Sequence, residues 1–273
     1  MAALFALKPL WFVLLAVGVI AAAVAGPIAP IGLLALGIAA VCCIFFERAA
    51  AREMIPSLQV LSGLAVVLCG LALALHLLPD FHNPTVIDRA VLKPEALPFS
   101  LSLNFDKTIA GVMVLGWCWS RPYNAVRPSA ALRLSLTAIV AVVTVLMGLA
   151  LLSGYVRWAP RVSVTFLLFA GVNLTVCLSE EAFFRGFLQT QFARIYRGAG
   201  ASIVSILLSG ALFGLAHLAG GWLYVGLATL AGIGYALVYH LTRRLECSVM
   251  THWSVNLLHF ALFTYPALAR GSH

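Results

Sequence analysis

The feature that most limits the fold of this chain is the length of its uncharged apolar stretches. Between Lys8 and Glu47 there is no charged residue, and similar stretches recur toward the C-terminus. A helix needs about 20 apolar residues to cross the hydrocarbon core of a bilayer. Because unpaired backbone groups are costly in lipid, such stretches are expected to be helical. The sequence therefore predicts an all-α, polytopic membrane helical bundle.

Breaks between the apolar stretches predict eight or nine transmembrane helices. The apolar stretch 108–120 is short, so it is either a short span or a re-entrant piece. Residues 80–107 carry mixed charges and three prolines, and we expect an extramembrane loop that contains no folded domain. We expect N-terminal membrane spans in 1–160 and a catalytic helical core in 161–268. The expected spans are about 9–25, 29–46, 57–79, 108–120, 131–153, 162–179, 201–218, 222–241 and 247–268.

Charge and composition argue against a nucleic-acid partner and favour a lipid surrounding. Only 10% of the residues are charged, against about 25% in soluble domains, and the net charge of +8 is scattered between apolar stretches. Loops beside membrane helices collect positive charge, so no nucleic-acid partner is expected, and the lipid bilayer is the expected surrounding. The distribution of Lys and Arg favours an N-terminus inside the cell. The Ala- and Leu-rich composition suggests a bacterial cytoplasmic membrane protein.

The most unusual polar stretch runs from Ser179 to Arg185, at the end of the span 162–179. A charge at membrane depth costs about 2.5 to 3.5 kcal/mol, so two carboxylates and a guanidinium there indicate a function. Glu181 and Arg185 are four residues apart and are expected to form an ion pair on one helix face. Glu180 points elsewhere and is expected to lack a local partner. Desolvation would then raise the pKa of its carboxyl into the range of a general base.

The other polar groups within predicted spans also lie in the last hundred residues. Phe213 and His217 lie on one helical stripe with Gly210 and Gly214, whose lack of a side chain allows a neighbouring helix to approach closely. His252, Asn256 and His259 form a second stripe, in which His259 is the weakest candidate. Asn173, two turns before Glu180, is expected to make a hydrogen bond between helices.

A carboxylate and two imidazoles from three spans suit two hydrolytic chemistries, and the residues alone leave both open. In one, Glu180, His217 and His252 hold a zinc ion with an open position for water. In the other, no metal is needed. Glu180 is the general base, His217 positions the water, and His252 with Asn256 stabilises the oxyanion.

Other signatures of membrane hydrolases are missing from the sequence. There is no His-Glu-x-x-His motif, Ser209-Gly210 lacks the preceding glycine of a rhomboid-type nucleophile, and no predicted span contains aspartate. These absences argue against the usual zinc proteases, rhomboid-type serine proteases and an aspartyl dyad.

Three motifs in order, Glu180-Glu181-x-x-x-Arg185, Phe213-x-x-x-His217 and His252-x-x-x-Asn256, resemble the CPBP family of intramembrane proteases. That family includes the type II CAAX prenyl endopeptidases and bacteriocin-processing or immunity proteins, and the resemblance covers about residues 162–268. It implies that Glu180 activates water, that Glu181 pairs with Arg185, and that His217, His252 and Asn256 complete the site. Since the family is described both as metallo-type and as glutamate-dependent, the implied cofactor is either none or one zinc ion.

The function expected from the sequence is hydrolysis of a peptide bond in a membrane-associated protein or peptide. Removal of a C-terminal sorting tag or of a leader peptide would fit a bacterial chain. Two alternatives from other classes stay open. One is a non-catalytic immunity or scaffold protein, and the other is a proton-coupled transporter that uses Glu180 and the histidines as a relay. The transporter is disfavoured because the sequence contains no internal repeat.

Overall fold

A computed structural model describes residues 8–119, 125–196 and 198–269, and it divides the chain into two compact units. The first unit comprises Met1–Pro84, Leu103–Ser120 and Leu178–Phe187, and the second comprises Thr85–Ser102, Arg121–Cys177 and Leu188–His273. Ser120, the last residue of the expected span 108–120, lies outside the described residues. The chain is predominantly helical, which confirms the predicted fold class.

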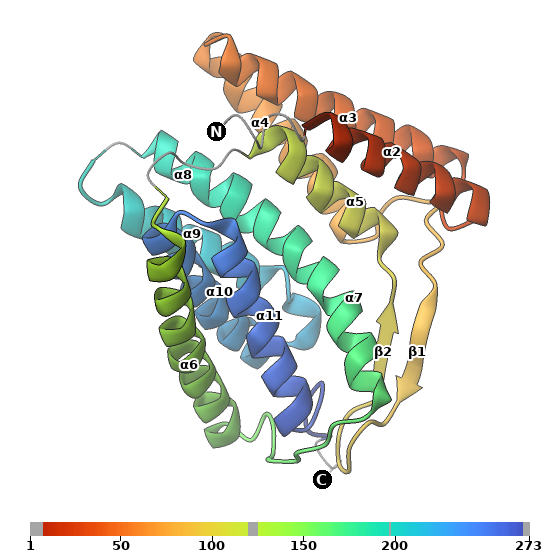
Figure 1. Ribbon diagram of the computed structural model, residues 1–273, viewed down its shortest axis with the longest axis vertical. Coiled ribbons are helices and arrows are strands. Elements are labelled where there is room, and N and C mark those ends of the chain that lie inside the picture. The colour runs from red at the N-terminus through yellow and green to blue at the C-terminus, as the bar shows by residue number, and fades with distance from the viewer. Residues whose placement is uncertain (1–7, 120–124, 197, 270–273) are drawn as a thin grey trace. The chain divides into compact units, whose positions relative to one another are not determined.

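The first unit is built from α2 (Lys8–Ala25), α3 (Pro30–Ala51), α4 (Pro56–Ala74) and α5 (Phe105–Met113), which continues into a π-helical turn, Val114–Cys118. Proline occupies the start of α3 and of α4, where its missing N–H costs nothing. α3 packs against α4, and α5 contacts both (Figure 1). The end of α7 (Val164–Glu181) belongs to this unit, together with most of the π-helical segment Ala182–Gln189 that follows it.

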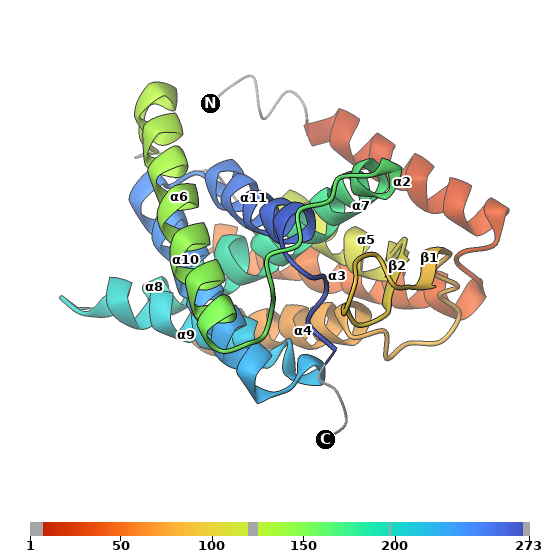
Figure 2. The ribbon, with the colours of Figure 1, turned by 90° about the horizontal axis from the view of Figure 1, so that it is seen from below.

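The second unit contains α6 (Pro128–Leu152), most of α7, α8 (Thr190–Ile195), α9 (Ala201–Leu215), α10 (Trp222–Thr242) and α11 (Leu245–Leu262). α10 packs against α6, α9 and α11, a grouping that Figure 2 shows from below. The contact between α9 and α10 is close. A Cβ added to Gly210 would lie 2.5 Å from Ile233, and one added to Gly214 would collide with Thr229. The predicted close approach at these glycines is therefore confirmed.

Five helical segments of the described residues are long and apolar enough to cross a membrane: α3, α4, α6, the continuous helix Val164–Ile195 and α10. Trp11–Ala25 and α9 are shorter apolar helices. These segments support an integral membrane protein, and the count of eight or nine spans stays a prediction. The 32 residues of Val164–Ile195 exceed the roughly 20 that a bilayer requires, and the helix continues beyond the acidic pair.

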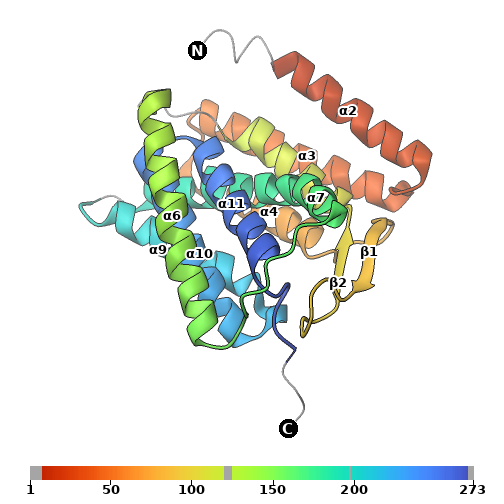
Figure 3. The same ribbon diagram turned by 60° about the horizontal axis from the view of Figure 1, so that its bottom comes forward.

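Residues 80–107, in which no folded domain is expected, contain a short β-ribbon. Two antiparallel strands, β1 (Thr85–Ala90) and β2 (Phe99–Ser102), pair within this segment (Figure 3). The prolines that suggested an irregular loop lie before and between the strands and leave their hydrogen bonds intact. The Phe99 ring packs on Phe169 and Tyr265, with centroids 6.1 and 4.9 Å away, so the ribbon is anchored in the aromatic core of the second unit.

Candidate active site

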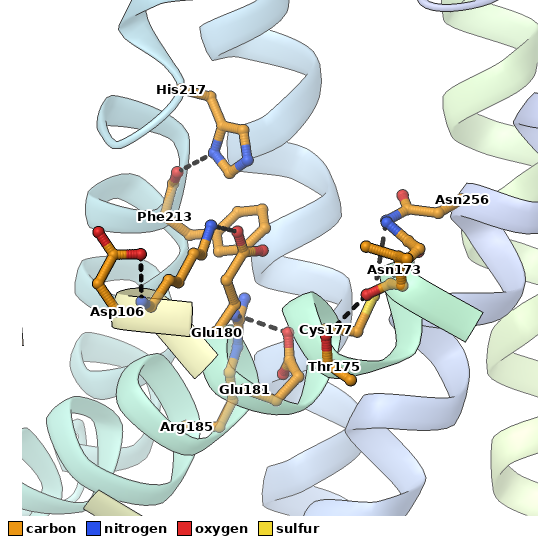
Figure 4. A network of polar contacts seen from close by, with 12 residues as sticks. Asp106, Asn173, Thr175, Cys177, Glu180, Glu181, Arg185, Phe213, His217 and Asn256 are labelled. Atoms are coloured by element: carbon orange, nitrogen blue, oxygen red, sulfur yellow. Dashed lines mark hydrogen bonds and ion pairs between the residues drawn. The ribbon is translucent and has the colours of Figure 1, made fainter. Parts of the chain in front are cut away.

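The acidic pair lies where the helix changes its geometry. α7 ends at Glu181, and a π-helical segment follows directly. Such segments are rare and occur often at functional sites. Glu181 and Arg185 are fully buried, and Arg185 Nη1 donates to Glu181 Oε1 over 3.0 Å, which is the ion pair that the spacing predicts (Figure 4). Leaving either partner alone would strand a buried charge, so this pair fixes the chain just after Glu180.

Glu180 has a partner that the sequence did not reveal, and the prediction of an unpaired carboxylate is wrong. Lys107 Nζ donates to Glu180 Oε1 over 2.5 Å. The side chains are only 19% and 9% exposed, so water screens this pair weakly. Lys107 is distant in sequence and lies in a segment predicted as a loop, so spacing along the chain gave no sign of it.

The first turn of α5, which carries Lys107, is held by buried polar groups. Asp106 is 1% exposed, and its carboxylate accepts hydrogen bonds from His76 Nδ1 at 2.6 Å, Asn83 Nδ2 at 3.1 Å and the Lys107 N–H at 2.8 Å. Burial alone would raise the pKa of Asp106, but these hydrogen bonds outweigh it and lower the pKa below its usual range. The Phe105 N–H donates to Asn83 Oδ1 over 2.8 Å and so caps the same turn.

His217 lies just beyond the end of α9, beside a buried aromatic ring. Its Nδ1 is 2.7 Å from the Phe213 carbonyl oxygen, so Nδ1 carries the proton and donates it. This hydrogen bond leaves Nε2 as the nitrogen that accepts. The Phe213 ring contacts both candidate imidazoles, with centroids 4.7 Å from His217 and 5.4 Å from His252. The structure therefore brings the two predicted histidines to one aromatic ring within the second unit.

α11 places His252 and Asn256 against different neighbours. The ring of His252 is 4% exposed and stacks on Tyr235 at 4.5 Å. Asn256 Nδ2 donates to Asn173 Oδ1 over 3.2 Å, which confirms the predicted bond between helices. Cys177 also donates to Asn173 Oδ1, so the amide of Asn256 is held from α7 (Figure 4). His259 Nε2 binds the Thr264 carbonyl instead and secures the chain after α11.

The candidate residues thus fall into two groups, one in each unit. Glu180, Glu181 and Arg185 lie in the first unit, and Phe213, His217, His252 and Asn256 lie in the second. Convergence of Glu180 with the histidines therefore stays a prediction.

Zinc binding by Glu180, His217 and His252 stays a prediction, because these residues lie in different units. The carboxylate of Glu180 already binds the Lys107 ammonium, a cation that a second cation would have to displace. Within residues 8–119, 125–196 and 198–269, no three His, Cys, Asp or Glu side chains are gathered as a metal site would require. These observations favour the alternative in which Glu180 acts without a metal ion.

Comparison with known proteins gives one match. Residues 160–258 match the sequence family described as Type II CAAX prenyl endopeptidase Rce1-like. The matched segment contains the candidate residues from Glu180 to Asn256, but not His259, Lys107 or Asp106. No curated protein and no solved structure matches the chain significantly.

Proposed function

We propose that this chain is a glutamate-dependent intramembrane endopeptidase with Glu180 as its general base, on the premise that residues 160–258 match the type II CAAX prenyl endopeptidase Rce1-like family. The family supports an intramembrane protease in general, acting on a membrane protein in a lipid environment. The observation that carries the finer proposal is the buried Glu180 carboxylate, which binds the Lys107 ammonium and directly precedes the Glu181–Arg185 ion pair in the chain.

The proposed reaction moves one proton through Glu180. The carboxylate takes a proton from water as the water oxygen bonds to the scissile carbonyl carbon. The Nδ1 proton of His217 is donated to the Phe213 carbonyl, so Nε2 is available as an acceptor. Nε2 accepts a hydrogen bond from the second O–H of the water and so orients the attacking lone pair, while that proton stays on the water oxygen. Glu180 then gives its proton to the amide nitrogen, the C–N bond breaks, and the carboxylate is restored.

His252 and Asn256 are proposed to stabilise the oxyanion of the tetrahedral intermediate. Both are potential donors on one stripe of α11, and both are held before substrate arrives, His252 by Tyr235 and Asn256 by Asn173. Donors fixed in advance lose little entropy when charge develops, and removal of one such donor costs about 100- to 1,000-fold in kcat. Phe213 supports both imidazoles.

The proposed substrate is a membrane-anchored protein or peptide, cut to remove a C-terminal sorting tag or a leader. The protein is an integral membrane protein. We further propose that it lies in a bacterial cytoplasmic membrane with its N-terminus inside. An epitope tag fused to the N-terminus of this protein and accessible only from the cytoplasm would support that orientation. An N-terminal epitope tag accessible only from outside the cell would contradict that orientation.

The test is cleavage of quenched fluorogenic peptides by the purified full-length protein in proteoliposomes. One peptide carries a prenylated CAAX end, and the other carries an unmodified transmembrane tail. Wild type is expected to cut at least one of them, and His217→Ala to lose the activity. His82→Ala, which removes an exposed histidine, is the matched control and should retain it. Activity that survives an added chelator supports the metal-free version, whereas loss that zinc restores contradicts it.

A further inference from the structure

The strongest feature outside the matched segment is the contact that Lys107 makes with Glu180. An ammonium at 2.5 Å from Oε1 favours the ionised carboxylate, which is the form that a general base requires. Lysine is a compact point charge with three donors, so it can hold one carboxylate oxygen while the side chain keeps its position. The contact therefore acts on both the charge and the direction of Glu180.

The position of Lys107 is set by residues that do not themselves contact Glu180. Asp106 binds His76 and Asn83, which both follow α4 in the chain, and it also binds the backbone N–H of Lys107 itself. A carboxylate in the first turn is further favoured by the helix dipole. The start of α5 is thus tied to the segment after α4.

A second contact fixes how α5 lies along α7. A Cβ added to Gly111 would collide with the Cα and Cβ atoms of Ser179, so the two backbones are in close approach there. Lys107 and Gly111 are four residues apart and share one face of α5, while Ser179 and Glu180 are adjacent on α7. The glycine contact therefore brings the lysine to the level of Glu180.

We propose that Lys107 is a positioning residue of the reaction, which keeps Glu180 ionised and aimed, and that Asp106, His76, Asn83 and Gly111 set the place of Lys107. The inference rests on the proposed function of Glu180. When Glu180 takes the water proton, the ion pair becomes a hydrogen bond from the ammonium to a neutral acid, and return of the proton to the leaving nitrogen restores the pair.

The test compares Lys107→Met and Lys107→Arg with wild type, as full-length proteins in proteoliposomes. Misplacement of a reacting group costs about 100-fold, so Lys107→Met is expected to lower kcat by about 10- to 100-fold while KM changes less than about twofold. Lys107→Arg keeps the charge and is expected to recover part of kcat. Arg89→Met, which removes an exposed cation from β1, is the control and should match wild type.

A purely structural role predicts other results. If Lys107→Met keeps wild-type kcat, or if Met and Arg variants lose thermal stability and activity equally, the inference is overturned. Should Lys107→Met fail to fold, Asp106→Asn replaces it. Asp106→Asn is expected to lower kcat by a smaller factor and to leave KM nearly unchanged. An unchanged kcat in this variant would count against the inference. An inactive Glu180→Gln with a fully active Lys107→Met refutes this inference alone, whereas a fully active Glu180→Gln refutes the proposed function.

Discussion

Lys107 Nζ lies 2.5 Å from Glu180 Oε1, although 73 residues separate the two in the chain. The pair joins α5, which lies outside the segment matched to the protease family, to the acidic motif inside that segment. The first half of the chain therefore supplies part of the surroundings of the proposed base.

The Glu181–Arg185 pair is expected to stabilise the fold. Removal of one partner of a buried pair typically costs about 3 to 5 kcal/mol, so Arg185→Met should lower the unfolding temperature strongly. Adding Glu181→Gln to this variant removes the stranded charge and should recover part of the loss. Thermal unfolding in detergent measures both effects. An Arg185→Met protein as stable as wild type would contradict this account.

Gly111 should tolerate no larger residue. Gly111→Ala places a methyl group where Ser179 lies, so α5 must move away from α7 and Lys107 with it. We expect lower stability and lower kcat. Gly148→Ala is the matched control, since a Cβ at this glycine of α6 meets nothing within 4 Å and alanine favours helix. Equal behaviour of the two variants would show that the contact is unimportant.

The stabilisation from Asp106 should depend on pH. Its pKa is lower in the folded protein than its usual value of 3.8, so the stabilisation is fully present above that value and is lost as the pH falls through the folded pKa. At pH 7, Asp106→Asn is expected to cost about 1.5 to 3 kcal/mol, the range for hydrogen bonds to a charged group. Unfolding measured from neutral to acidic pH should show the two proteins converging. A constant difference would contradict the assignment.

Lys93 should also make stability rise with pH, but at alkaline pH. It is buried and donates to the Phe263 carbonyl, and burial, with a smaller contribution from Arg161, lowers its pKa from 10.5 to about 8. Between these values the unfolded chain binds a proton that the folded chain lacks, so stability should rise as the pH goes from about 8 to 10.5. Lys93→Met should remove this rise, and its persistence in the variant would count against Lys93 as the source.

The sequence predicted the features that depend on nearby residues. The Glu181–Arg185 pair follows from helical spacing, and the close packing at Gly210 and Gly214 follows from their stripe on α9. The Lys107–Glu180 pair and the β1–β2 ribbon were not predicted. The first depends on how α5 docks on α7, and the second was hidden because prolines beside short strands look like an irregular loop. Long-range contacts between polar residues leave no periodic signal in a single sequence.

The central claim is that Glu180 is the general base of a membrane endopeptidase. The most direct measurement is kcat for a membrane-anchored fluorogenic peptide with wild type, Glu180→Gln and the control Glu246→Gln, which alters an exposed, ion-paired glutamate. We expect Glu180→Gln to fold, as judged by thermal unfolding, and to lose cleavage, because an amide cannot accept the water proton. Glu246→Gln should cut like wild type. A folded Glu180→Gln protein that cleaves at the wild-type rate would contradict the account.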